Sequence, residues 1–260
     1  MEWEATARLT VFLTVFAAMA LWELGRPLRL GAAARPRRWS TNLALVVIDT
    51  IVVRLLFPAA AVGAALDAEA MGWGLFNLIE APLWLAVILS FLLLDLAIWA
   101  QHLITHKIPI LWRFHRVHHA DRDIDVTTAI RFHPVEIALS MLLKIGLVYL
   151  LGPPAIGIIA FEIILNGTAM FNHANIRLPM SLDAALRRIL VTPDMHRVHH
   201  SVHRREHDSN YGFALSIWDR MFGTYIAQPE VRHEDMQIGL EWQDDRPSKL
   251  GWSLMLPFRK

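Results

Sequence analysis

The stretch Asp95–His119, DLAIWAQHLITHKIPILWRFHRVHH, decides the fold, because it ends an apolar run and then places five histidines within eighteen residues. Spacings of three and four residues bring side chains to one face of a helix. The histidines that this spacing groups are His102 with His106, and His115 with His118 and His119. The stretch therefore predicts an apolar helix whose end carries clustered imidazoles.

A second copy of the H-x-x-H-H pattern lies in TPDMHRVHHS, residues 192–201, as His196, His199 and His200. A single histidine on an apolar helix is usually a core or surface residue with an ordinary hydrogen bond. Eight imidazoles in three clusters are too many for one metal ion and suit two. The pattern predicts that the whole set binds metal.

Composition points to lipid contact. Of the 260 residues, 55% are hydrophobic and 19% are charged, whereas a soluble domain carries about 25% charged residues. The net charge of +1 argues against nucleic acid as a main partner. The sequence has no cysteine, which excludes thiolate zinc sites and iron–sulfur clusters, so any metal is held by nitrogen and oxygen.

The N-terminal part of the chain begins with an apolar segment, residues 9–24, of borderline spanning length. The alternative is a signal peptide with a cleavage site at the sequence AMA, residues 18–20. Glu2 and Glu4 disfavour it, because such signals begin with positive charge.

The loops set the expected orientation. The basic residues of the first loop are Arg26, Arg29, Arg35, Arg37 and Arg38. Because Lys and Arg accumulate on the cytoplasmic side, this loop is predicted to lie inside. A second run, residues 42–66, contains Asp49 and Arg54, which can pair with each other or with neighbouring helices. The acidic loop 67–81 then lies outside, and a third run, Pro82–Gln101, returns inside.

Two further apolar helices, residues 136–151 and 155–171, are predicted around the turn at residues 152–154. Both are short for full spans. Their charged residues are Glu136, Lys144 and Glu162. A tilted and a re-entrant hairpin both remain open, and either brings the chain back inside at His173. The arginine-rich sequence after residue 175 agrees, so all the histidine clusters are expected on the cytoplasmic side.

The expected fold is all-α, an integral membrane helical bundle with a cytosolic histidine-rich cap. No boundary marks a second domain, so residues 1–260 are interpreted as one domain, with additional membrane helices in residues 1–66 and an amphipathic tail in residues 227–260. Trp242, Trp252 and Phe258 of this tail are predicted to lie at the lipid surface.

Imidazole suits iron, zinc, copper and nickel, and affinity alone does not choose among them. The zinc-protease pattern H-E-x-x-H is absent from the sequence, and eight or nine neutral ligands around two ions suggest a redox pair that activates dioxygen. Carboxylates near the ions would balance their charge and orient the rings. The candidates are Asp95, Asp121, Asp125 and Asp194. For Asp194, a helix-capping role after Thr192-Pro193 is equally open.

Six segments together carry a family resemblance. In chain order they are DLAIWAQHLITH, LWRFHRVHH, DVTTAIRFHPVE, NHANI, VTPDMHRVHHS and NYGFALSIWDRMFGTY. They resemble the fatty acid hydroxylase and sterol desaturase superfamily of membrane di-iron oxygenases over about residues 84–226. The resemblance implies a cytosolic di-metal centre that uses O2 to hydroxylate or desaturate a C–H position of a lipid.

The resemblance also implies a ligand set. The ligands carried over are His102, His106, His115, His118, His119, His173, His196, His199 and His200. Where fatty acid 2-hydroxylases have two histidines four residues apart before the last box, this chain has Ala169 and His173, which implies nine nitrogen ligands completed by water. His133 is expected either beside the ligands or at a helix start. His203 and His207 are expected at the surface, although metal contact stays open.

The resemblance further implies two non-haem iron ions, a membrane lipid substrate and electrons from a separate reductase, ferredoxin or cytochrome. A fused cytochrome b5 domain does not fit in this chain. An arginine-rich inner face is the expected docking site of the electron donor. A bacterial inner membrane is the expected location, with the endoplasmic reticulum as the alternative. The lipid, the choice between hydroxylation and desaturation, and the oligomeric state stay open.

Two other functions fit the sequence less well. A bis-histidine haem electron carrier needs facing histidines deep in the membrane spans, whereas these histidines cluster at predicted helix ends. A metal transporter needs ligands near the midplane. Its only candidates are Asp49, Glu136 and Glu162. The oxygenase interpretation is therefore favoured.

Overall fold

The helices of the protein follow its apolar runs, and prolines stand at the start of several of them. The computed structural model describes residues 2–31 and 33–259. The longer helices are α1 (Glu2–Gly25), α2 (Arg35–Leu56), α3 (Ala60–Ala70), α5 (Leu83–Lys107), α6 (Pro109–His119), α7 (Pro134–Leu151) and α8 (Ala155–His173). The shorter ones are α4 (Leu75–Leu78), α9 (Met180–Leu186), α10 (Pro193–His199), α11 (Arg204–His207), α12 (Ile217–Met221) and α13 (Leu250–Met255). The all-α prediction is confirmed, with only two isolated β-bridges in the described residues.

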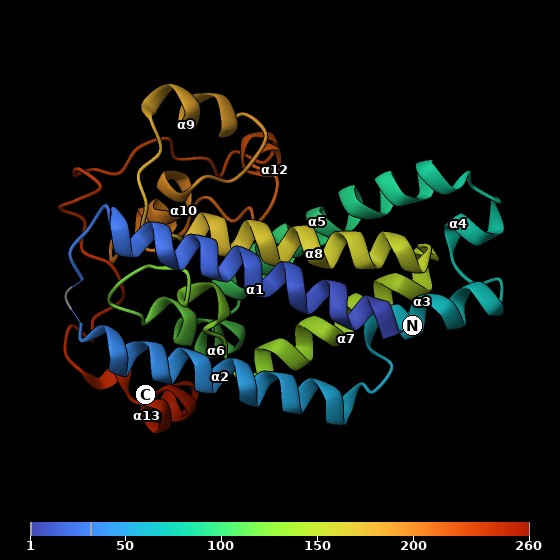
Figure 1. Cartoon of the computed structure of the whole chain (residues 1–260), viewed down its shortest axis with the longest axis horizontal. Helices are drawn as coiled ribbons and strands as arrows, with labels where there is room; N and C mark the ends of the chain where they lie inside the picture. Colours follow the sequence, from blue (N-terminus) through green and yellow to red (C-terminus); the bar gives the residue numbers. More distant parts are fainter. Residues whose placement is uncertain (1, 32, 260) are drawn as a thin grey trace.

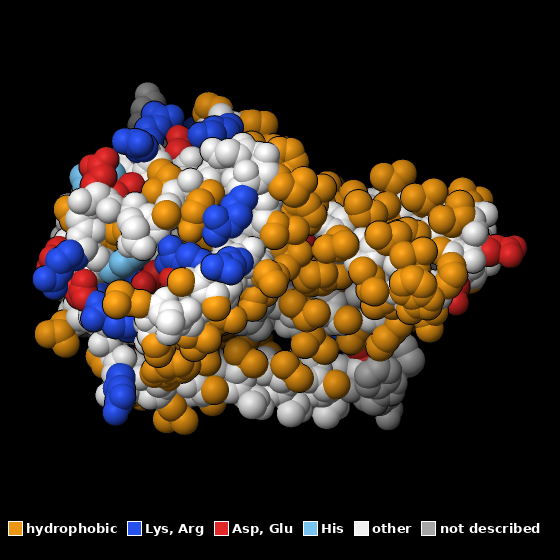
Figure 2. Space-filling view, turned by 90° about the horizontal axis from the view of Figure 1, so that it is seen from above, with side chains coloured by type: hydrophobic (Ala, Val, Ile, Leu, Met, Phe, Trp, Pro, Cys, Tyr) orange, Lys and Arg blue, Asp and Glu red, His pale blue; other side chains and the backbone are white. Residues whose placement is uncertain are grey.

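The long helices run side by side and define the long axis of the molecule (Figure 1). Five stretches are long and apolar enough to cross a membrane. They are Glu4–Gly25, Arg35–Leu78, Leu83–Lys107, Pro134–Leu151 and Ala155–His173. Hydrophobic side chains cover one half of the molecule, whereas charged side chains gather at the other end (Figure 2). An apolar half and a charged end are typical of a membrane helical bundle with a polar cap.

The second apolar run, residues 42–66, is divided between two helices. Helix α2 ends at Leu56, Phe57 is extended, and α3 begins at Ala60. Pro58 is the physical reason, because proline lacks an N–H and disfavours helical geometry in the residue before it. The suggested pair of Asp49 with Arg54 does not form: Asp49 is buried, Arg54 is exposed, and no ion pair of the described residues joins them.

Charges inside the bundle neutralise one another where α1, α7 and α8 meet. Lys144 Nζ of α7 lies 2.7 Å from Glu162 Oε1 of α8, and Arg8 of α1 pairs with the other oxygen of the same carboxylate. Arg8 also lies 2.9 Å from Glu4. Because isolated charge is costly at membrane depth, this cluster explains how charged residues occur within the apolar helices.

A buried polar network joins α2 to the segment that follows α6. Arg38 pairs with Asp125 and lies 2.8 Å from Asp121. Burial alone would raise the pKa of Asp121, but Arg38 and Arg131 beside it hold this pKa below its ordinary value. Arg131 is itself fully buried, and it donates to the carbonyl of Val117 in α6 (2.8 Å) and to that of Pro247 in the tail (2.9 Å). The network fixes the end of α6, which carries three of the histidines.

The C-terminal segment packs against α2 and α6, and this corrects the expectation for Trp252. Its side chain is 8% exposed and packs edge-on against Trp242, with ring centroids 5.1 Å apart, in one apolar cluster with Leu45 and Val117. Apolar area removed from water is worth more here than contact with lipid headgroups. Phe258 remains 59% exposed.

We expect Arg38→Ala to destabilise the protein by about 3–5 kcal/mol, because it leaves two buried carboxylates without their partner. Arg37→Ala is the matched control: its ion pair with Asp245 is exposed on both sides and is worth about 0–1 kcal/mol. The measurement is thermal unfolding of the detergent-solubilised protein. Equal unfolding temperatures for the two variants would contradict this role of Arg38.

Candidate metal centre

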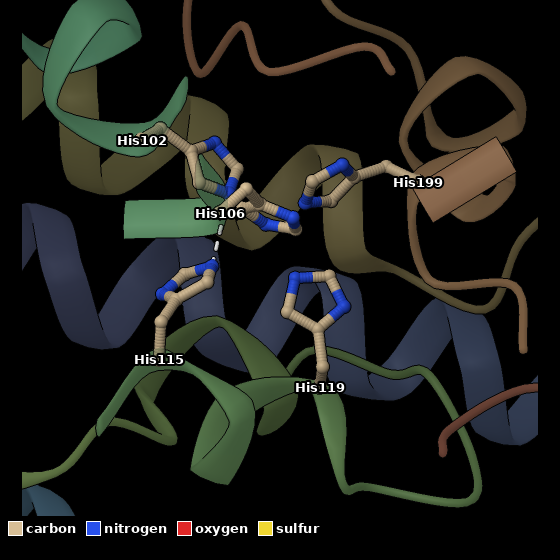
Figure 3. A group of neighbouring side chains, drawn as sticks. All are labelled: His102, His106, His115, His119 and His199. Atoms are coloured by element: carbon tan, nitrogen blue, oxygen red, sulfur yellow. Dashed lines mark hydrogen bonds between the residues drawn. The ribbon is translucent and has the colours of Figure 1, made fainter. Parts of the chain in front are cut away.

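Nine buried histidines form two adjoining groups at the polar end of the bundle. The first group is His102, His106, His115, His119 and His199, and the second is His118, His173, His196 and His200. In each group one nitrogen per ring lies within 4.8 Å of the others. Figure 3 shows the first group, with rings from separate segments turned toward a common centre. These are the same nine residues that the family resemblance implied.

Four helices deliver the rings. His102 and His106 occupy the last turns of α5, and α6 follows after Ile108, with Pro109 in its first turn. The end of α6 sends His115 and His119 to the first group and His118 to the second, because these positions lie on neighbouring faces of the helix. His173 ends α8, and α10 divides its three histidines between the groups.

Backbone carbonyls orient four of the nine rings. Nδ1 of His102 lies 2.7 Å from the carbonyl oxygen of Tyr211, and Nδ1 of His199 lies 2.6 Å from that of Ser209. Nδ1 of His118 and of His173 likewise face the carbonyls of Arg131 (3.1 Å) and Ala169 (2.7 Å). A carbonyl can only accept a hydrogen bond, so each Nδ1 carries the proton and each Nε2 keeps a free lone pair. This is the arrangement that metal-binding histidines adopt.

A carboxylate orients a fifth ring. Nδ1 of His115 lies 2.6 Å from Oε1 of Glu136 in α7. The second oxygen of Glu136 is buried without a hydrogen-bond partner among the described residues. A carboxylate that accepts the Nδ1 proton raises the basicity of the ring and fixes its orientation. Glu136 therefore prepares His115 to donate its Nε2 lone pair.

The proton-free nitrogens face one another. Nε2 of His102 is 3.1 Å from Nε2 of His115, the contact dashed in Figure 3, and Nε2 of His173 is 3.2 Å from that of His118. Two lone pairs at this distance repel unless a cation lies beside both. For metal–nitrogen bonds of about 2.0–2.1 Å, neighbouring ligands stand about 2.9–3.4 Å apart. The observed separations fit ligands that share an ion.

Other ring nitrogens have no hydrogen-bond partner among the residues that the structure describes. The nitrogens of His106, His119 and His200 are buried without a hydrogen bond, as is Nε2 of His199. Burying such groups unsatisfied costs about 1–3 kcal/mol each. Burial, followed by the charge of neighbouring imidazoles, also holds the pKa of His119 and His200 well below 6.5. The rings are therefore neutral at physiological pH, which is the state that binds metal.

The four residues expected beside the ligands make other contacts. Asp95 accepts from the indole of Trp218 (2.8 Å), and Asp125 accepts from that of Trp39 (2.9 Å). Asp194 pairs with Arg197 at 2.5 Å. His133 caps the start of α7 by accepting from the N–H of Val135 at 3.2 Å. The contacts of Asp95, Asp125 and Asp194 are thus with these donors and not with a ligand histidine, and for His133 the structure shows the helix-start alternative.

The remaining histidines separate into two kinds. His203 is exposed, as expected. His207 is half-buried, and its ring stacks on Trp112 with centroids 5.5 Å apart, 6.0 Å from the ring of His106. It belongs to neither group of nine. His207 therefore lines the approach to the first group rather than the outer surface.

Sequence reasoning missed the roles of Glu136 and Asp219. Asp219 accepts hydrogen bonds from the backbone N–H groups of Tyr211 and Gly212, both 2.8 Å long, and from the indole of Trp99 (3.0 Å). It thereby holds the Tyr211 carbonyl that orients His102. The available signal for Glu136 was an acidic residue at the start of an apolar helix, which points to a functional site.

The fold and the site together define a helical membrane protein with two buried groups of histidine nitrogens. Residues 87–224 match the fatty acid hydroxylase family. Because this match covers more than half of the chain, the protein belongs to that family, as its histidine boxes predicted. No solved structure matches the chain significantly.

Curated relatives include lipid-oxidising enzymes from several organisms. Alkylglycerol monooxygenase of Xenopus tropicalis is 31% identical over 168 residues, covering 61% of this chain and 35% of the relative. Ornithine lipid hydroxylase OlsE of Rhizobium tropici is 29% identical over 160 residues, covering 60% of this chain and 46% of the relative. Cholesterol 25-hydroxylase of Rattus norvegicus is 28% identical over 150 residues, 56% and 48% of the two chains. The matches thus span less than half of each relative.

We expect Glu136→Gln to weaken metal binding about 10–100-fold, since the amide accepts the His115 proton less strongly than the carboxylate does. The measurement is the metal retained by purified protein during titration with a chelator, read by elemental analysis. Glu69→Gln, at an exposed position near the end of α3, is the charge-matched control. If both variants retain metal like the unaltered protein, Glu136 does not support a ligand.

Proposed function

We propose that the protein is a membrane lipid hydroxylase in which the nine histidines hold two iron ions. The observation that carries the proposal is that proton-free Nε2 atoms lie 3.1–3.2 Å apart in each of two adjoining buried groups. Nitrogen ligands alone do not choose the metal. Membership of the fatty acid hydroxylase family supports iron, and the names of the relatives support a lipid substrate.

The reaction balances as one C–H bond, O2, two electrons and two protons giving one alcohol and one water. When bound, the iron pair supplies the electron transfer that activates O2 toward an unactivated C–H bond. Aromatic side chains of the chain itself pack beside the histidines. Trp112 lies 4.9 Å from His106 between ring centroids, Phe213 lies 5.1 Å from His102, and Phe132 stacks on His118 at 4.5 Å. These aromatic rings cover part of each group and limit its contact with water.

The electrons would come from a separate reductase, ferredoxin or cytochrome. Basic side chains gather at the polar end of the molecule (Figure 2), and such a surface attracts an acidic partner. By the positive-inside rule, the same basic residues support a cytoplasmic location for this end. A bacterial inner membrane is the proposed location.

The proposal is tested by comparing the lipids of cells that express the unaltered protein, His118→Ala or His203→Ala. His118 belongs to the second group, whereas His203 is exposed and outside both groups. We expect a lipid heavier by one oxygen atom with the unaltered protein and with His203→Ala, and its loss with His118→Ala. A loss of two hydrogens instead would indicate desaturation. Identical lipids in all three cultures would contradict lipid oxidation.

A further inference from the structure

A pocket apart from the metal centre lies at the connection between α1 and α2. It measures about 330 Å³, and its walls come from the end of α1, the residues that lead into α2, the segment after α6 and the segment after α8. Among the described residues, its lining and the two histidine groups have no member in common. Both helices meet the polar end of the molecule here (Figures 1 and 2). The pocket therefore lies where two candidate spans end and lipid headgroups begin.

Hydrogen bonds between segments distant in sequence build the walls of this pocket. Oε1 of Glu23 accepts from the backbone N–H groups of Val126 and Asn175, both at 2.8 Å. The side-chain amide of Asn175 in turn accepts from the N–H of Arg29 (3.1 Å) and donates to the carbonyl of Arg29 (2.9 Å). The fold thus holds the end of α1 and the loop after it in fixed positions beside the cap.

Two buried polar atoms of the pocket lining have no partner. Glu23 is 1% exposed and Arg38 is 3% exposed, yet Oε2 of Glu23 and Nε of Arg38 have no hydrogen bond within the described residues. A buried acceptor or donor is costly when it is left unpaired. A single water takes about 30 Å³ and leaves most of the pocket empty. The lining therefore favours a ligand that has both an N–H donor and an anionic acceptor.

A third charged residue and two exposed leucines complete the site. Arg35 also lines the pocket, is half-buried, and has no ion pair in the described part of the chain. Leu24 and Leu30 line it too, and they are 59% and 92% exposed. Apolar area of this kind is unfavourable in water and favourable against hydrocarbon chains. The leucines therefore indicate an occupant whose polar part enters the pocket while its chains stay in the bilayer.

We propose that this pocket binds the headgroup of a membrane lipid that carries a primary ammonium and a phosphate. The ammonium supplies N–H donors to Glu23, and the phosphate accepts from Arg35 and from Nε of Arg38. This site goes beyond the proposed oxidation, because it is separate from the histidines and needs no turnover. The bound lipid joins α1 and α2 to the segment that follows α6.

Headgroup binding is tested by native mass spectrometry of the full metal-loaded chain in detergent. The probes are phosphatidylethanolamine, phosphatidylcholine and phosphatidylglycerol with the same acyl chains, and free phosphoethanolamine. We expect phosphatidylethanolamine to bind about tenfold more tightly than the other two lipids. Choline has no N–H to donate to Glu23, and glycerol has no positive charge. Free phosphoethanolamine is expected to bind more weakly, because it lacks the chains that contact Leu24 and Leu30.

Two variants with matched controls locate the site. Glu23→Gln keeps an oxygen for the two backbone N–H groups but removes the charge, and Glu69→Gln makes the same change at an exposed position of α3. Arg35→Gln removes the phosphate partner, and Arg37→Gln is its control, because Arg37 is exposed and does not line the pocket. We expect each pocket variant to lower the affinity for phosphatidylethanolamine about tenfold and each control to leave it unchanged. Metal content equal to that of the unaltered protein verifies folding.

Several results would overturn this site. Equal affinity for the three lipids removes the preference for a primary ammonium, and equal effects of the pocket variants and their controls place the lipid elsewhere. Free phosphoethanolamine that binds as tightly as the lipid assigns the pocket to a soluble ligand and removes the membrane lipid as its occupant. Because every measurement is one of binding, these results are independent of whether cells that express the protein form an oxygenated lipid.

Discussion

Electrostatic repulsion between unprotonated imidazole nitrogens is the constraint on which the rest of the structure depends. Five rings have Nδ1 committed to a carbonyl or to Glu136, so their Nε2 lone pairs have no protons with which to bond each other. The protein nevertheless brings two pairs of them, His102 with His115 and His118 with His173, to 3.1 and 3.2 Å in the buried end of the bundle. A cation bound by these nitrogens removes the repulsion between them. The free energy of metal binding therefore adds to the stability of the folded protein.

Buried polar residues around the histidines hold the ring nitrogens in these positions. Asp219 fixes the Tyr211 carbonyl behind His102, and Arg131 ties the end of α6 to the tail while its own carbonyl faces His118. Arg38 then joins α2 to the segment after α6. Each contact is a buried hydrogen bond or ion pair between segments distant in sequence, so losing one displaces rings that it does not touch.

Much of the fold and of the histidine cluster could be predicted from the sequence. The same physical reasons explain which features could not be predicted. Helical spacing grouped the histidines because three- and four-residue intervals share a face, and the resemblance supplied His173, which stands alone. Sequence could not divide the nine rings between two groups, since α6 and α10 each contribute to both. It also missed the break at Pro58 within the apolar run and the contact of Glu136 with His115, which depends on how α6 and α7 pack.

The central claim is that each histidine group holds its own ion. Diffraction from crystals of the iron-loaded protein, recorded on both sides of the iron absorption edge, tests it most directly. The account predicts two anomalous peaks, one among His102, His106, His115, His119 and His199 and the other among His118, His173, His196 and His200. A single peak, a haem iron, or peaks away from these rings would contradict it.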